Sequence, residues 1–362
     1  MRRGRRATKR SGAPRLLALG ALFAAGILAL GGAYLTGASS QGESTGAAIV
    51  PPSSEPSSIS MRLMGNFGPQ FAGEMLAART GLFRREGLKV ELREGADSEE
   101  AIAAVASGAD AIGVARADSF LEARGKGSLI VAFAASFIES PVAFYALKKS
   151  TLRGAQDFAE MRIGLRAGDD TEVSFEALAA KLGLPRSTMR EAAVGSDVST
   201  LINGDVDVWP GHVGRDDYAL ASRGVEYIAV SPGSYGVHLP GSVYFASEQT
   251  VRERSQLLQS FLRSVIAGWQ LAYANASISV PMIVSFDQKK MTPDSVRFAL
   301  ESQRDSVRPI AARFCEFDES HWRSLQEILL SQRLLDKPVD LSLAVTYQFL
   351  NEAYRKPYTF GQ

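Results

Sequence analysis

The sequence predicts an α/β protein built from two similar halves, and three observations support this prediction. The chain has 362 residues, 46% of them hydrophobic. This length exceeds that of one compact lobe, so two lobes or domains are expected. Short apolar runs alternate with stretches of helical periodicity from residue 59 onwards. An echo also occurs once in each half: a helix-like stretch ends at Ser107-Gly108 before residues 111–114, and another ends at Asn203-Gly204 before residues 207–209.

The expected elements follow from the spacing of apolar residues and from the turn residues between them. The first half should contain strands at 61–64, 88–92, 111–114, 129–134 and 141–147, with helices at 71–80 and 99–106. The second should contain strands at 161–165, 206–209 and 226–230 and a helix at 173–182. After residue 242 the pattern is mainly helical. There the spacing of Phe261, Leu262, Val265 and Trp269 predicts a buried helix face.

The first forty residues have the pattern of an export signal. Seven cations between Arg2 and Arg15 precede twenty uncharged residues, 16–35, and small residues follow that permit cleavage after Ala38. A helix of that length spans about 30 Å, so the segment could also stay as an uncleaved membrane anchor. No Cys follows it, which excludes a lipoprotein anchor there. We expect the folded part of the chain to lie outside the cytoplasm, in the periplasm or at the outer face of the cytoplasmic membrane.

Residues 39–58 are rich in Gly, Ser and Pro, so we expect a flexible linker and a fold that begins near Ile59. The formal net charge is +1, and because +7 precedes the first acid, the remainder carries −6. This distribution does not predict nucleic-acid binding. Cys315 is the only cysteine, which excludes an intramolecular disulfide and a Cys-cluster metal site. We interpret Cys315 as a core residue, and expect no metal and no cofactor.

One segment resembles a known signature. Residues 80–92, TGLFRREGLKVEL, are similar to the "GyFkeeGLdVel" motif of periplasmic binding proteins for nitrate, sulfonates, taurine and thiamine-pyrimidine precursors. Further segments match in the family's order over about residues 60 to 350, among them Ser107-Gly108, 157–164, 201–207, and Phe261-Leu262-Arg263 with Gly268-Trp269. Tyr235-Gly236-Val237 before a strand at 243–246 looks like the thiamine-pyrimidine branch.

The resemblance implies a type II periplasmic-binding-protein fold, in which two α/β lobes are joined by two crossovers with a ligand cleft between them. It implies a first lobe of residues 59–146 plus 244–350, a second lobe of residues 147–243, and a C-terminal tail of residues 351–362. Two departures concern the solute. Asp110 stands one place before the family's expected acid, with Ala111 in that slot, and the His often carried on the first helix is absent from Gly68-Pro69-Gln70-Phe71.

Candidate site residues follow the expected strands, because ligands of open α/β sheets bind beyond the carboxyl ends of the strands. Segments 115–119 and 210–213 should therefore face the cleft. The candidates for solute contact are Asn66, Phe67, Gln70, Phe71, Arg116, Asp118, Phe137, Glu139, Ser140, Thr171, Glu172, Trp209, His212, Tyr235 and His238. Structural alternatives stay open: Phe71 in the core, Asn66 as a helix cap, a surface salt bridge between Arg116 and Asp118, capping by Asp170 or Thr171, and solvated loop histidines.

These residues mix flat rings with uncharged polar groups, which suits a planar heterocycle. We therefore expect the extracytoplasmic substrate-binding protein of an ABC importer, which delivers a thiamine-pyrimidine-like solute to permease subunits. An aliphatic sulfonate, taurine or nitrate is the alternative solute, for which Arg116 is the one cation placed in the cleft. An enzyme or a membrane-anchored sensor on the same fold is an alternative from another class. No Gly-x-Ser-x-Gly, Walker, HExxH or Ser-x-x-Lys motif is present, so we expect no enzymatic activity.

Overall fold

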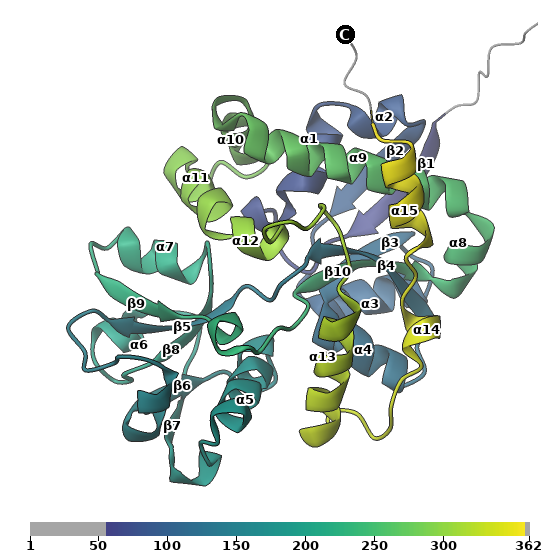
Figure 1. Ribbon diagram of the computed structural model, residues 1–362. Helices are drawn as coiled ribbons and strands as arrows, with labels where there is room; N and C mark the ends of the chain where they lie inside the picture. Colours follow the sequence, from purple (N-terminus) through teal and green to yellow (C-terminus); the bar gives the residue numbers. More distant parts are fainter. Residues whose placement is uncertain (1–55, 359–362) are drawn as a thin grey trace, which may run out of the picture. The chain divides into compact units, whose positions relative to one another are not determined.

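The computed structural model describes residues 56–358 of the chain (Figure 1). The expected signal or anchor and most of the expected linker lie outside these residues. The first strand begins at Ser57, two residues before the expected start of the fold. No helix within residues 56–358 has both the length and the apolar character required to cross a membrane.

A five-stranded sheet organises the first part of the fold. Its strand order is β2-β1-β3-β10-β4, with β1 Ser57–Arg62, β2 Leu88–Arg93, β3 Ile112–Arg116, β4 Ile130–Phe137 and β10 Ser242–Ser247. β1 runs parallel to β2 and β3, whereas β10 is antiparallel to both β3 and β4. The chain thus leaves this sheet after β4 and returns to it between β3 and β4 with β10.

Helices cover this sheet on both faces. They are α1 Ala72–Arg79, α2 Leu82–Arg85, α3 Ser98–Ala106, α4 Ala117–Gly125, α8 Glu248–Glu253, α9 Ser255–Ala274, α10 Ala276–Val284, α11 Pro293–Ser302, α12 Arg304–Val307, α13 Glu319–Ser331, α14 Leu341–Ala344 and α15 Gln348–Arg355. All eight residues of β4 are buried, although β4 is an edge strand of the sheet. The reason is that α14 and α15 pack against it and Val345 forms a bridge to Ala132. Ala353 on α15 is buried, so the fold continues into the expected C-terminal tail.

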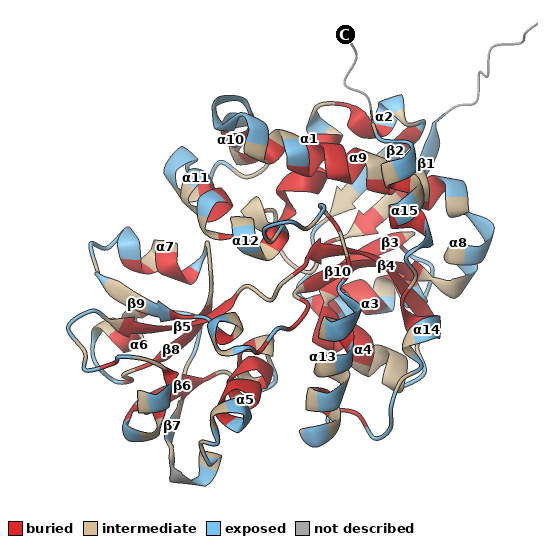
Figure 2. Ribbon diagram, viewed as in Figure 1, coloured by how far each residue is buried: buried red, intermediate tan, exposed pale blue. Residues whose placement is uncertain are grey.

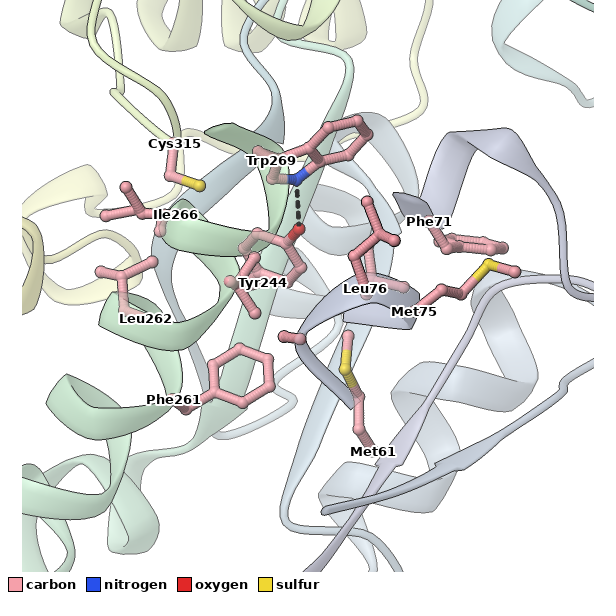
Figure 3. Close-up of a cluster of buried hydrophobic side chains, with 14 of the residues drawn as sticks. Met61, Phe71, Met75, Leu76, Tyr244, Phe261, Leu262, Ile266, Trp269 and Cys315 are labelled. Carbon is pink, nitrogen blue, oxygen red and sulfur yellow. Dashed lines mark hydrogen bonds between the residues drawn. The ribbon is translucent and has the colours of Figure 1, made fainter. Parts of the chain in front are cut away.

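The buried face predicted for the long C-terminal helix is confirmed. Phe261, Leu262, Val265 and Trp269 on α9 are 0% exposed, and Figure 2 shows the inner sides of α1 and α9 as buried. Within this cluster Trp269 Nε1 donates to the hydroxyl of Tyr244 on β10 at 3.2 Å (Figure 3). Cys315 is 1% exposed in the same cluster, which confirms its prediction as a core residue.

A second group of strands lies between β4 and β10 in the sequence. β5 Val142–Leu147 pairs antiparallel with β8 Trp209–His212 and β9 Tyr227–Val230, and β6 Arg162–Leu165 pairs parallel with β7 Arg190–Ala193. The helices here are η2 Ala155–Glu160, α5 Asp170–Leu182, η3 Arg186–Thr188, α6 Ser199–Ile202, α7 Asp216–Ala221 and η4 Pro232–Tyr235. The strand expected at 206–209 is displaced, because Val208 forms only an isolated bridge to Ile163 and pairing begins at Trp209.

The pairing of β5 affects where the boundary between the two lobes is placed. The expected division places residues 142–146 in the first lobe, but β5 pairs with β8 and β9 in the second sheet. We therefore propose crossovers at 138–141 and 231–241, with lobe 1 built on the five-stranded sheet and lobe 2 on the remaining strands. One apolar cluster includes Phe120 and Trp322 beside the first sheet and Phe144 and Phe175 beside the second, so the two lobes share buried contacts.

Candidate functional site

A large cavity of about 700 Å³ lies where loops from both sheets converge. Its lining comprises Met64, Gly65, Asn66, Phe67, Gly68, Pro69, Gln70, Phe71, Ala96, Asp97, Ser98, Arg116, Phe137, Pro141, Arg166, Asp169, Asp170, His212, Val213, Gly214, Arg215, Tyr218, Gly241, Ser242, Lys290, Met291, Ser295, Ala299 and Gln303. The loops after β1, β2, β6 and β8 and the last residue of β3 all contribute, so the cavity lies at the carboxyl ends of strands, as expected for an α/β fold. We refer to it as the large cavity.

The loop between β1 and α1 supplies one wall. Phe67 N donates to Glu94 Oε1 at 2.7 Å, and the Phe67 ring packs on Phe286 with centroids 5.2 Å apart. Gln303 Nε2 holds the loop from the other side by donating to Pro69 O at 2.8 Å. These contacts orient an aromatic ring and the amides of Asn66 and Gln70 along the wall. The short helix η1 (Pro69–Phe71) is capped by Gly68, so Asn66 is not its cap.

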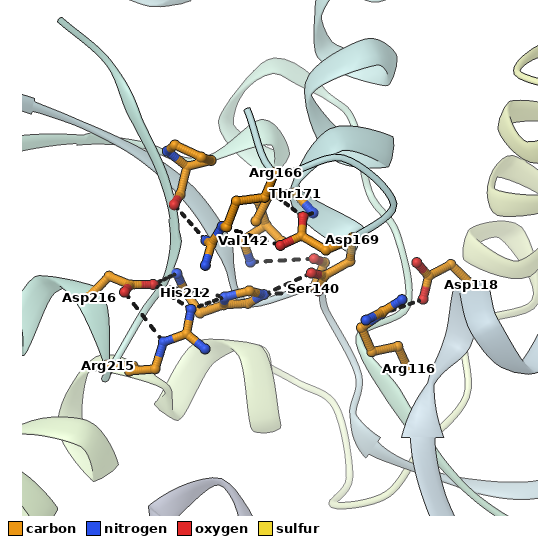
Figure 4. A network of polar contacts seen from close by, with 12 residues as sticks. Arg116, Asp118, Ser140, Val142, Arg166, Asp169, Thr171, His212, Arg215 and Asp216 are labelled. Atoms are coloured by element: carbon orange, nitrogen blue, oxygen red, sulfur yellow. Dashed lines mark hydrogen bonds and ion pairs between the residues drawn. The ribbon is translucent and has the colours of Figure 1, made fainter. Parts of the chain in front are cut away.

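Arg116 and Asp118 form a buried ion pair beside the cavity (Figure 4). Arg116 Nε lies 3.1 Å from Asp118 Oδ1, and its Nη2 donates to Ser119 Oγ at 2.7 Å. Burial raises the pKa of Asp118 to about 6, and the nearby Asp170 adds to this effect against the charge of Arg116. The side chains are 22% and 7% exposed, so the pair is not the surface salt bridge considered above. Arg116 lines the cavity, whereas Asp118 lies behind it.

His212 sits in a second polar network at the opposite wall (Figure 4). Its Nε2 lies 2.9 Å from Asp170 Oδ1, and Arg215 Nη2 lies 2.9 Å from its Nδ1. Because an arginine can only donate, Nδ1 accepts and Nε2 carries the proton that is donated to Asp170. Burial alone would raise the pKa of Asp170, but His212, Arg116 and Arg166 hold that pKa well below its usual range. Asp170 therefore stays a carboxylate.

Arg166, Arg215 and Lys290 reach the cavity without having been predicted from the sequence. Arg166 directly follows β6, as Arg116 ends β3, so its place after a strand was a usable signal. Its Nη2 donates to Pro210 O at 2.6 Å, and its Nε lies 3.2 Å from Asp169 Oδ2. No local pattern marks Lys290, because the folding of a distant helical segment brings it to the site.

Several predicted site residues lie elsewhere. Trp209 is 0% exposed in the core of the second lobe, because it is the first residue of β8, whereas the cavity is lined from the last residue of that strand, His212, onwards. Thr171 is buried and bonds to Asp169, which caps α5 in place of Asp170 or Thr171. Glu172 accepts from Gly168 N and pairs with Arg186. The Tyr235 hydroxyl accepts from Ala155 N at 2.9 Å. None of these four residues lines the large cavity.

A small cavity of about 330 Å³ contains the remaining candidates. Glu139, Ser140 and His238 line it, together with residues of the segment 231–239 and with Asp305, Ser306 and Pro309. Ser140 N donates to Leu239 O at 2.8 Å, so the two crossovers run side by side here. Of the fifteen predicted residues, the large cavity therefore receives Asn66, Phe67, Gln70, Phe71, Arg116, Phe137 and His212.

The fold is that of periplasmic solute-binding proteins. The aliphatic sulphonate-binding protein SsuA of Escherichia coli superposes with a TM-score of 0.66 at 14% identity, covering 80% of this chain and 97% of that one. The sequence matches the NMT1/THI5-like family over residues 68–277, and the chain belongs to this family.

Two relatives in sequence are named for different functions. The riboflavin-binding protein RibY of Chloroflexus aurantiacus is 23% identical over 319 residues, covering 83% of this chain and 88% of that protein. The 4-amino-5-hydroxymethyl-2-methylpyrimidine phosphate synthase of Legionella pneumophila is 20% identical over 311 residues, covering 85% and 96%. Proteins similar to this chain are thus named both as a binding protein and as a synthase.

Proposed function

We propose that the chain is the extracytoplasmic solute-binding protein of an ABC importer and that it captures a small heteroaromatic solute, first of all one similar to the pyrimidine precursor of thiamine. The observation that carries this proposal is the pairing of charges around the large cavity. Arg116, Arg166, Arg215 and Lys290 are the Arg and Lys side chains that the described residues bring to it, and each lies within 3.5 Å of a carboxylate oxygen.

This pairing disfavours a small anion. A sulfonate or nitrate would have to compete with Asp118, Asp169 or Asp216 for guanidinium groups that already have partners, and for Arg116, whose partner Asp118 is 7% exposed, separating the pair is costly. A flat neutral ring can instead lie against the aromatic wall while polar groups contact its edge. Phe67 lines the cavity from the first lobe and Tyr218 from the second, and Asn66, Gln70 and Asp170 supply donors and acceptors.

Calorimetry on purified protein tests the solute class. The panel contains 4-amino-5-hydroxymethyl-2-methylpyrimidine and riboflavin on one side, and taurine, an alkanesulfonate and nitrate on the other. We expect saturable binding of a heteroaromatic compound and an affinity loss of about ten-fold or more in Phe67→Ala and in Tyr218→Ala, since each removes a buried ring contact. Arg153→Ala, which changes an exposed arginine on lobe 2, is the matched control.

One result of the same titrations would reverse the assignment of the solute class. Saturable sulfonate binding that disappears in Arg116→Ala and is unchanged in Phe67→Ala and Tyr218→Ala would replace the heteroaromatic assignment with the anion assignment. The observation that favours this second candidate is the cluster of cations itself. Turnover of any bound compound would instead favour an enzyme, and a gene neighbourhood without permease subunits would favour a sensor.

A further inference from the structure

We propose that Glu139, His238 and His321 form a binding site for a zinc-like divalent transition-metal ion beside the small cavity. The three residues lie on three separate segments: Glu139 in the crossover between β4 and β5, His238 in the segment that leads into β10, and His321 in the first turn of α13 (Figure 1). Two of the chain's three histidines are therefore brought to one carboxylate.

The distances from the two histidine nitrogens to the carboxylate oxygen fit tetrahedral coordination. His238 Nδ1 lies 3.3 Å and His321 Nε2 lies 3.5 Å from Glu139 Oε1, and one donor atom from each of the three residues lies within 4.8 Å of the others. Zinc bonds of about 2.0–2.1 Å at tetrahedral angles place neighbouring donor atoms about 3.3–3.4 Å apart. Each nitrogen is thus already at the separation from the carboxylate oxygen that a shared ion requires.

The backbone holds these segments in place. Ser140 N donates to Leu239 O at 2.8 Å, and Glu139 N donates to Ser306 O at 3.0 Å. Asp318 Oδ1 caps α13 by accepting from Ser320 N, which fixes the turn that carries His321. The site therefore forms from anchored backbone, so little ordering has to accompany ion binding.

The closeness of two imidazoles to one carboxylate favours an ion over simple ion pairing. The two rings have centroids 5.6 Å apart and planes inclined by 11°, and each has a nitrogen within 3.5 Å of the same oxygen, so a modest rotation of the rings brings both lone pairs onto one ion. Two protonated rings in this position would repel each other, whereas one cation coordinates both neutral rings and the carboxylate. Two His and one Glu form a donor set that suits zinc better than magnesium or calcium, which prefer all-oxygen sites.

A metal ion can reach these three residues from solvent, and a further ligand is available to it. His238 is 50% exposed and lines the small cavity, so an ion can reach the site from solvent. Asp318 Oδ2 lies 3.6 Å from His321 Nε2 but is not among the donor atoms that lie within 4.8 Å of one another, so we expect water to complete the coordination. Metal binding through Nε2 leaves the proton of His321 on Nδ1, a buried atom with no hydrogen-bond partner among the described residues. Because Nδ1 of His321 lacks this hydrogen bond, we expect an affinity for zinc about 10- to 100-fold weaker than that of a site whose histidine ligands are hydrogen-bonded through their second nitrogen.

The test uses the full chain without affinity-tag histidines, stripped of metal with a chelator and titrated with Zn²⁺ by calorimetry. We expect one equivalent to bind in the native protein, at least ten-fold weaker binding in His238→Ala and in Glu139→Gln, and unchanged binding in His212→Ala, which removes the histidine outside the cluster. Zinc should raise the melting temperature of the native protein in a concentration-dependent way, and less so in His238→Ala. Co²⁺ should give the visible absorption of a tetrahedral ion.

The proposal is overturned if zinc does not bind saturably, or if His238→Ala and His321→Ala bind it as the native chain does. His238 is half-exposed, so its variant stays informative if His321→Ala fails to fold. The zinc titration is independent of the solute panel, because the three ligands lie outside the lining of the large cavity.

Discussion

At the scale of single residues, Glu74 is the most unusual side chain of the first lobe. It lies on α1, is 0% exposed, and neither carboxylate oxygen has a hydrogen-bond partner among the described residues. Burial raises the pKa of Glu74 to about 7, against smaller opposing contributions from its own backbone and from Tyr244. A buried acid of this kind favours the protonated form of the folded protein.

This predicts a pH-dependent stability that Glu74→Gln should abolish. The folded-state pKa is above the unfolded value of about 4.5, so the stability that Glu74 contributes is fully present below about pH 4.5 and is lost as the pH rises through about 7. At pH 8 the glutamine variant should be more stable than the native chain by the order of 3 kcal/mol, and at pH 4 the difference should vanish. Urea denaturation at both pH values measures this.

Glu160→Gln, at an exposed position, is the matched control and should change stability little at either pH. A Glu74→Gln variant that is less stable than the native chain at pH 8 would mean that the carboxylate has a stabilising partner, which contradicts the explanation by burial.

At the scale of elements, α1 and α9 pack through two glycines. A Cβ added to Gly268 would lie 2.0 Å from Gly73 O, and a Cβ added to Gly73 would lie 2.4 Å from the Trp269 ring. The Gly268-Trp269 pair in the sequence therefore has a packing role: the glycine lets the helices approach closely, and the tryptophan reaches Tyr244.

We predict that Gly268→Ala destabilises the protein by about 1–3 kcal/mol, because the methyl group must push the two helices apart. An alanine in a helix interior would otherwise stabilise by up to about 1 kcal/mol, so the sign separates packing from helix propensity. Gly125→Ala at the end of α4 is the control, since its added Cβ meets side-chain atoms of Leu335 and Val339 and no backbone atom of a neighbouring helix. Equal or higher stability of Gly268→Ala in chemical denaturation would refute the close approach.

At the scale of the whole molecule, the proposed lobes meet on two sides of the large cavity. Tyr218 on α7 packs against Phe298 on α11 with ring centroids 5.4 Å apart, and Gln332 Nε2 beyond α13 donates to Val173 O on α5 at 3.2 Å. The crossovers at 138–141 and 231–241 are the covalent connections. Because two such connections allow the lobes to rotate, we expect a hinge motion that closes them on a bound solute.

Spin-label distances test this motion in a protein whose single cysteine, Cys315, is buried and unreactive towards labels. Labels at Ser222→Cys and Arg297→Cys, on either side of the contact, should show a shorter and narrower distance distribution once a solute identified by calorimetry saturates the protein. A pair at Glu253→Cys and Arg297→Cys, within the first lobe, should not change. An unchanged distance across the lobes at saturation would exclude closure on the solute.

The fold could be predicted from the sequence because the spacing of apolar residues over short stretches indicates strands and helices. The buried run that becomes β4, the apolar face of α9 and the segment 80–92 each depend on neighbouring residues, and the resemblance ordered them into a known architecture. Asn66, Phe67, Arg116 and His212, which were expected in a cleft because they end or follow strands, line the large cavity, and their contact with a solute stays a prediction.

The sequence by itself determined the α/β class, the family and the loops that face the large cavity, because these follow from periodicity and from motifs a few residues long. Only the tertiary structure decided that Trp209 is core, that the cations of the cavity are paired, and that Glu139, His238 and His321 meet. The physical reason is distance along the chain. Burial and shared coordination depend on residues far apart in the sequence, such as Glu139 and His321. Each cation of the cavity pairs with a carboxylate one to three residues away, but no local pattern encodes that these pairs meet at one cavity.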